Sequence, residues 1–144
     1  MAANPMISMA AAQAMVNALG ALLNSGVIKV YSGAMPATTE TSASGTLLSS
    51  GCTLSATAFG ASTDSGTGFA VAPANAIATD TNCAAGGTAG YFRGYATGGT
   101  TCVVQGTVGT ASADMILSST TITMGGTLAI SSWVINMPDG SGAD

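Results

Sequence analysis

The scarcity of charge constrains this chain more than any other feature. Two basic and six acidic side chains leave 6% of the sequence charged, against about 25% in an ordinary soluble domain. Hydrophobic residues make up 47%, whereas disordered segments combine low hydrophobicity with high charge. We therefore expect one folded domain of ordinary size, with a surface built mainly from Ser, Thr, Gly and Ala.

A surface of this kind favours assembly with other proteins. Little net charge keeps copies apart in solution, so we expect further copies or a partner lattice to cover much of it. The net charge is −4 and the only cations are Lys29 and Arg93, so the chain cannot form the basic face that nucleic acid requires. The same shortage removes the usual electrostatic attraction to anionic membranes.

The apolar stretch from Met6 to Leu23 predicts a helix rather than a targeting or membrane-spanning segment. It lacks the basic n-region of a signal peptide, and it is too polar and too rich in Ala for a transmembrane span. Apolar residues recur at spacings of three and four, which is typical of a helix. We expect an N-terminal arm over residues 1–7 and a helix over residues 8–24.

Met9 and Val16 lie in the apolar stripe of this predicted helix. Ser8 is a suitable N-cap, and Gly26 is suited to the positive φ that often ends a helix. The stripe predicts that the helix packs against a larger body. That body is either the helix's own domain or a partner protein.

After Gly26 the period of the hydrophobic pattern changes from about 3.6 to 2, which predicts strands. Turn signals about every 8 to 14 residues separate eight or nine candidates: Val27–Tyr31, Thr46–Leu48, Cys52–Ala58, Phe69–Ala78, Thr88–Tyr95, Thr101–Val108, Met115–Leu117, Thr120–Met124 and Leu128–Met137. This spacing predicts a mainly β protein, an antiparallel β-sandwich or jelly roll of about eight strands preceded by one N-terminal α-helix.

The last predicted strand has apolar residues on both faces around Trp133, so we expect it to be central in the sheet. The single domain then spans residues 8–138. Residues 139–144 are expected to form a flexible tail.

The chain lacks the side chains that most catalysis requires. It has no His, which removes the commonest general base and the commonest metal ligand. Most of the acids lie beside Gly, Ser or Thr, where turns place Asp, and no EF-hand-type calcium loop is present. The Gly-rich stretches do not match a phosphate-binding loop. We expect no enzymatic activity, no metal and no cofactor.

Arg93 is the side chain that we single out as a candidate interaction residue. It lies between Tyr91 and Tyr95 on one face of a predicted strand. A lone cation in this position predicts either a cation–π contact with the tyrosines or an anchor at a subunit interface, where Arg and Tyr are enriched.

The three cysteines, Cys52, Cys83 and Cys102, form no CxxC pair. Without His, the common zinc and c-type haem signatures are missing. Three interpretations stay open. The cysteines are free thiols of a protein made in a reducing cytosol, or two of them form an intramolecular disulfide, or at least one cross-links neighbouring subunits in an oxidising medium.

A series of short segments follows one another between about residues 8 and 138: the Ala-rich helix that begins Ala10-Ala-Ala-Gln-Ala-Met, Ile28-Lys-Val-Tyr-Ser-Gly with Pro36 after it, Gly45-Thr-Leu-Leu-Ser, Ala58-Phe-Gly, Ala89-Gly-Tyr-Phe-Arg-Gly-Tyr, Gln105-Gly-Thr-Val-Gly-Thr and Trp133-Val-Ile-Asn-Met-Pro. In this order the segments resemble a group of small proteins encoded among the structural genes of tailed bacteriophages. The cysteines are not part of the pattern.

The resemblance implies a non-enzymatic virion protein. Its implied role is capsid decoration: a cement protein that binds and stabilises the lattice of the major capsid protein. Tail proteins are the alternative partners, because tail or fibre-associated modules, some of them host-binding, occur among similar small β proteins. Either role implies synthesis in the bacterial host cytoplasm, a place on the surface of the phage particle, and self-association as a homo-oligomer.

Overall fold

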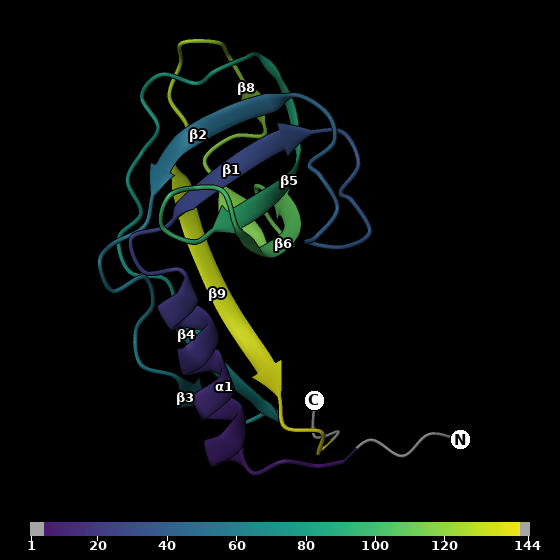
Figure 1. The fold of residues 1–144 in the computed structure, drawn as a ribbon, viewed down its shortest axis with the longest axis vertical. Coiled ribbons are helices and arrows are strands. Elements are labelled where there is room, and N and C mark those ends of the chain that lie inside the picture. Colours follow the sequence, from purple (N-terminus) through teal and green to yellow (C-terminus); the bar gives the residue numbers. More distant parts are fainter. Residues whose placement is uncertain (1–4, 142–144) are drawn as a thin grey trace.

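The computed structural model describes residues 5–141 and has the elongated shape seen in Figure 1. Most strands gather at one end of the long axis, and the helix and two short strands lie at the other. Parts of the expected arm (residues 1–4) and of the expected tail (residues 142–144) fall outside the described residues. Within residues 5–141, Ile7 N–H donates to the Asp139 carbonyl at 2.9 Å, so the two ends of the described chain lie side by side.

The predicted helix is confirmed as α1, Met9–Leu22. Ser8 is its N-cap, because the Ser8 hydroxyl accepts a hydrogen bond from Ala11 N–H at 3.1 Å. Ala12, Val16 and Gly20 form the buried side of the helix, which packs against β4 (Phe69–Pro73) and β9 (Ile130–Pro138). The helix therefore packs against its own domain.

The mainly β character is also confirmed. Besides β4 and β9, the strands are β1 Val27–Ser32, β2 Leu47–Thr53, β3 Thr63–Asp64, β5 Gly87–Tyr95, β6 Cys102–Gly109, β7 Met115–Leu117 and β8 Thr121–Ile122. They form one mixed sheet in the order β2-β1-β5-β6-β7-β9-β4-β3, with β8 paired to β5. As expected from its two apolar faces, β9 is an inner strand.

The sheet differs from the prediction in one pairing, since β6 and β7 run parallel while the other paired strands run antiparallel. The strand path is open and does not by itself divide into the two sheets of a sandwich or jelly roll. It curls, however, so that strands well separated in its order meet. Phe92 of β5 and Trp133 of β9 contact edge-to-face, with ring centroids 5.2 Å apart. Both rings belong to one hydrophobic core.

Two predicted strands, Thr46–Leu48 and Cys52–Ala58, are replaced by the single strand β2. The Ser49-Ser50-Gly51 signal between them is a bulge rather than a turn, because the register to β1 shifts there. The backbone N–H groups of Ser50 and Gly51 donate to the Asp80 carboxylate instead of to a neighbouring strand. The predicted strand Phe69–Ala78 ends early, at Pro73, which has no N–H for a sheet hydrogen bond.

Candidate functional site

The candidate residues around Arg93 lie on one face of the β1–β5 pair. Lys29 is opposite Arg93, Tyr31 is opposite Tyr91, and Val27 is opposite Tyr95. Alternate residues of a strand point to the same side, so these cations and tyrosines share a face that is opposite the buried core residues of the same strands, Ile28, Val30 and Phe92. We call this surface, formed by Lys29, Tyr31, Tyr91, Arg93 and Tyr95, the cation–tyrosine face.

The three tyrosines of this face contact one another. The rings of Tyr31 and Tyr91 are stacked, with centroids 5.2 Å apart and planes inclined by 12°, and the hydroxyls of Tyr31 and Tyr95 lie 3.3 Å apart. Burial, together with this hydrogen bond, raises the pKa of Tyr31 well above its ordinary value. The phenol is therefore neutral at physiological pH.

The cation that lies over a tyrosine ring is Lys29, not Arg93 as one sequence interpretation predicts. Lys29 Nζ is 4.5 Å from the centroid of Tyr95 and donates to the Gly99 carbonyl at 2.8 Å. The guanidinium of Arg93 instead donates from Nε to Gln105 Oε1 at 3.1 Å. Its Nη2 donates to two backbone carbonyls of the loop between β1 and β2.

That loop, Gly33–Thr46, covers the cation–tyrosine face, and we call it the covering loop. Arg93 Nη2 reaches its Thr38 carbonyl at 3.1 Å and its Thr41 carbonyl at 2.7 Å. The Tyr91 hydroxyl donates to the Ser44 carbonyl at 2.7 Å and accepts from Ser44 N–H at 2.9 Å. Gln105 Nε2 donates to the Pro36 carbonyl at 2.7 Å. Long-range side-chain contacts thus hold a segment that has no regular structure of its own.

Because of this cover, Tyr91, Arg93 and Tyr95 are only 0%, 2% and 7% exposed. The structure brings the three together, as the strand pattern predicts, but it places them beneath the chain's own loop. Their role at a subunit interface stays a prediction. The sequence gives no signal for the covering partners, because they lie 47 to 55 residues away along the chain.

The two helix candidates, Met9 and Val16, lie on the packed side of α1. Val16 is fully buried, and Met9 is half-buried against the same core. The side of α1 that faces solvent carries Met15 and Leu22, with small residues such as Ala11 and Ala18 between them. Sequence reasoning missed this side, although the signal was available in a helix whose only polar side chains are Gln13 and Asn17.

The three cysteines are free thiols, with Cys52 and Cys83 buried and Cys102 half-buried. Burial raises the pKa of each thiol, so all three are protonated at neutral pH. An intramolecular disulfide is not formed. A cross-link between subunits stays a prediction, and the half-buried Cys102 is the thiol best placed to make one.

Asp80 is a buried acid, 6% exposed, that the sequence does not distinguish from the turn acids. Its Oδ2 accepts hydrogen bonds from the Ser49 hydroxyl at 2.6 Å and from Gly51 N–H at 3.0 Å, and its Oδ1 accepts from Asn82 N–H at 2.9 Å. Burial acts to raise the pKa of Asp80, but these hydrogen bonds outweigh it and hold the pKa below its ordinary value. The carboxylate thus fastens the chain before β5 to the bulge of β2.

No group of three or more His, Cys, Asp or Glu side chains that could hold a metal ion occurs among residues 5–141. Within the same residues, no helix has the length and apolar character needed to cross a membrane. Comparison of the chain with family models, with curated proteins and with solved structures finds no match.

Proposed function

We propose that this chain is a non-enzymatic structural protein that assembles with other proteins through an uncharged surface. In its specific form, the proposal is a capsid decoration protein that binds and stabilises the major capsid lattice of a tailed bacteriophage. The observation that carries it is a contrast between the charged and the large apolar side chains. The charged groups are bound within the chain, whereas large apolar groups face solvent.

Each charged side chain in residues 5–141 has a hydrogen-bond partner within the chain. The two cations and Asp80 bind the groups described above. The remaining acids accept hydrogen bonds close to their own position in sequence: Glu40 from Thr39, Asp64 from Gly66, Asp114 from Thr107 and Asp139 from Ser141. Such groups contribute little to repulsion between copies, because there are few of them and their charge is partly compensated.

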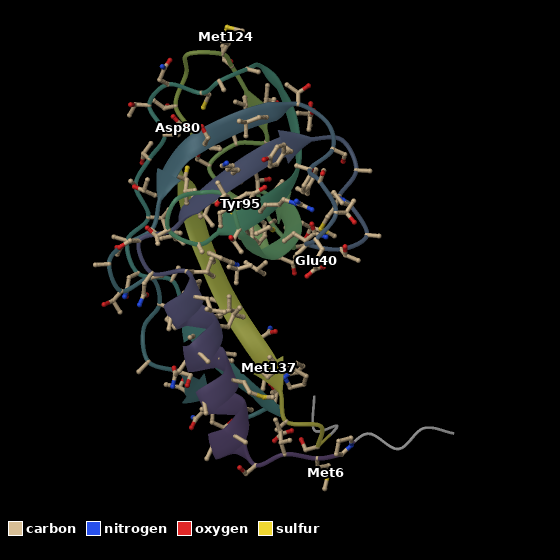
Figure 2. All side chains as sticks on the ribbon, in the orientation of Figure 1. Met6, Glu40, Asp80, Tyr95, Met124 and Met137 are labelled. Atoms are coloured by element: carbon tan, nitrogen blue, oxygen red, sulfur yellow. The ribbon has the colours of Figure 1, made fainter. Side chains whose placement is uncertain are left out.

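The exposed apolar side chains extend over the whole molecule. Six of them are between 42% and 72% exposed: Met6, Met15, Leu22, Met35, Met124 and Val134. Met6 and Met124 lie at opposite ends of the long axis (Figure 2). Apolar contact sites that are this far apart suit a protein that touches several neighbours at once, as a cement protein does.

The most continuous of these surfaces is the solvent-facing side of α1. Ala11, Met15, Ala18 and Leu22 follow one another at spacings of four, three and four, so they form one apolar strip along the helix. We call it the outer α1 strip. A strip of this kind packs into an apolar groove or against another helix, and repetition over a lattice gives avidity to weak single contacts.

The virion part of the proposal is supported by the resemblance of the ordered segments to tailed-phage structural proteins. The proposal also describes the fold more finely, as a β-sandwich or jelly roll. The Phe92–Trp133 contact supports this description, because it joins β5 and β9, which are not neighbours in the sheet. The alternative within the same class is a tail or fibre-associated module. The two differ in partner, namely the major capsid protein or tail proteins.

Counting the copies per particle tests the proposal. Quantitative mass spectrometry of purified particles, with a density located by electron microscopy, should give hundreds of copies on the head. A few dozen copies or fewer at the tail would overturn the capsid role in favour of the tail module. Absence of the protein from particles would overturn the virion role altogether.

A further inference from the structure

The two cations of the chain lie at one place in the structure. Lys29 and Arg93 are directly opposite each other on β1 and β5, and neither forms an ion pair with an acid among residues 5–141. Like charges in this position destabilise a strand pair. The positive charge of this chain, whose net charge is −4, thus lies on a single face. That arrangement favours an anionic ligand at this face.

Arg93 has hydrogen-bond donors left for such a ligand. A guanidinium carries five N–H groups, of which Nε uses one and Nη2 uses two in the contacts with Gln105 and the covering loop. The Nη1 donors have no partner among residues 5–141. Within this part of the chain, no fully buried side-chain nitrogen or oxygen lacks a partner, so Nη1 keeps a small contact with solvent. Arg93 therefore keeps unused donors at Nη1, although its side chain is only 2% exposed.

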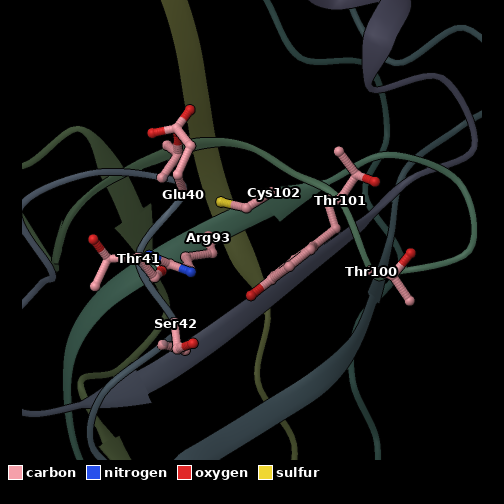
Figure 3. Close-up of a pocket in the computed structure, with 10 residues that line it drawn as sticks. Glu40, Thr41, Ser42, Arg93, Thr100, Thr101 and Cys102 are labelled. Carbon is pink, nitrogen blue, oxygen red and sulfur yellow. Dashed lines mark hydrogen bonds between the residues drawn. The ribbon is translucent and has the colours of Figure 1, made fainter.

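Arg93 is one of the residues that line a cavity of about 640 Å³ (Figure 3). Residues 39–43 of the covering loop form one side of the cavity, and residues 100–102 of the β5–β6 hairpin form the other. The lining is rich in hydroxyl groups, contributed by Thr39, Thr41, Ser42, Thr100 and Thr101. The volume lies within the range of small-molecule sites, and it far exceeds the space that a single bare anion needs.

We propose that this Arg93 pocket binds a carboxylate that also carries several hydroxyl groups, such as a uronic acid unit of a glycan. The carboxylate accepts hydrogen bonds from Arg93 Nη1, and the sugar hydroxyls exchange hydrogen bonds with the Thr and Ser side chains of the lining. Charged hydrogen bonds of this kind are about twice as strong as neutral ones. The site is a binding activity additional to the assembly role, and it does not depend on that role.

Glu40 provides the sharpest test, because it carries a negative charge on the lining of the same pocket. Its side chain is exposed and accepts hydrogen bonds only from its own loop, from Thr39 and Thr38. A carboxylate ligand would be repelled by it, so Glu40→Gln should tighten binding. A gain of affinity cannot result from misfolding, whereas replacing Arg93 would also remove the support of the covering loop.

The experiment is a titration of the isotope-labelled chain with sodium glucuronate, followed by NMR, with glucose and acetate as matched ligands. We expect saturable shifts at the Arg93 Nε–H and at the amides of Thr101 and Cys102, with glucuronate binding about tenfold more tightly than glucose or acetate. Glu40→Gln should strengthen glucuronate binding about two- to threefold at low salt. Thr101→Asp should weaken it about tenfold, and Thr101→Asn, which adds no charge, should weaken it less.

Cys102 supplies an independent readout, because its half-buried thiol lines the same pocket. Glucuronate should slow alkylation of Cys102 by iodoacetamide, and peptide mapping should locate the protection there. No saturable binding by either the natural chain or Glu40→Gln would overturn the proposal. So would equal affinities for glucuronate and glucose, since the carboxylate would then contribute nothing, or equal affinities for glucuronate and acetate, since the hydroxyls would then contribute nothing.

Discussion

The cation–tyrosine face and the outer α1 strip meet solvent in opposite ways. The first carries both cations and three phenols, yet the chain's own covering loop binds Arg93 Nη2 and the Tyr91 hydroxyl and leaves both residues almost fully buried. The second carries only apolar side chains, and Met15 and Leu22 remain 49% and 61% exposed. An ordinary soluble domain shields its apolar groups and hydrates its polar ones. This chain binds its charged groups internally and leaves large apolar groups exposed to solvent.

The largest expected effect is on stability, and it concerns the cation–tyrosine face. Arg93→Ala removes a buried guanidinium and leaves the carbonyls of Thr38 and Thr41 and the amide of Gln105 without their donor. We expect the free energy of unfolding, measured with urea, to fall by about 3 kcal/mol. Met15→Ala on the outer α1 strip is the control, and its effect should stay within about 0.5 kcal/mol. Similar losses of unfolding free energy for the two variants would show that the two surfaces do not differ in their contribution to stability.

The next effect concerns association. Met15→Glu combined with Leu22→Glu places charge on the outer α1 strip and should weaken self-association or lattice binding about tenfold or more, because a buried unpaired charge is costly. Light scattering and co-sedimentation with capsids measure this. Ala111→Glu adds a charge at an exposed loop position and is the matched control. If the control weakens binding as much as the double variant, the strip has no specific role.

A smaller effect concerns the internal carboxylate. The folded-state pKa of Asp80 lies below its ordinary value, so Asp80 contributes stability above the pKa of the unfolded chain, about 3.9. This contribution is lost as the pH falls through the folded-state pKa. Asp80→Asn should be less stable than the natural chain at pH 7, and the difference should shrink below about pH 4. Denaturant unfolding at a series of pH values measures this, and a difference independent of pH would contradict it.

The smallest expected effect concerns the thiols. Cys102 should react with a thiol reagent faster than Cys52 and Cys83, which are buried, and all three should react after unfolding. Because burial raises the pKa of each thiol, the native rate should rise with pH into the alkaline range. Cys102→Ser should remove the fast phase. Non-reducing electrophoresis of assembled material then tests the cross-link, and a monomer band with and without reductant would exclude it.

Local sequence patterns predict the helix and strands of this fold better than they predict which loops cover these elements. The spacing of apolar residues around Val16 and the apolar faces around Trp133 are properties of short segments, and both predictions hold. The alternation along β5 likewise places Arg93 and its tyrosines on one face. It cannot show that this face is covered, because the Thr41 carbonyl that binds Arg93 lies 52 residues away.

Other differences between the predicted and the observed fold also arise from contacts between residues that are far apart in sequence. Residues 49–51 separate two predicted strands, and they form a bulge within one strand because Asp80, about 30 residues further on, accepts the free N–H groups. The parallel pairing of β6 and β7 leaves no trace in the hydrophobic period. The two-residue strand β3 is too short to give a periodic signal at all.

The short length of β7 has a mechanical consequence for the sheet. Its three residues are the sheet's connection between β2-β1-β5-β6 on one side and β9-β4-β3 on the other. A load that pulls these two groups of strands apart therefore falls on the few hydrogen bonds of β7, on the Phe92–Trp133 contact, and on Asp80, which binds the β2 bulge and Leu128. In the proposed role, a change in the shape of the capsid lattice would load this connection, and we expect the β7 pairings to break before those within either group of strands.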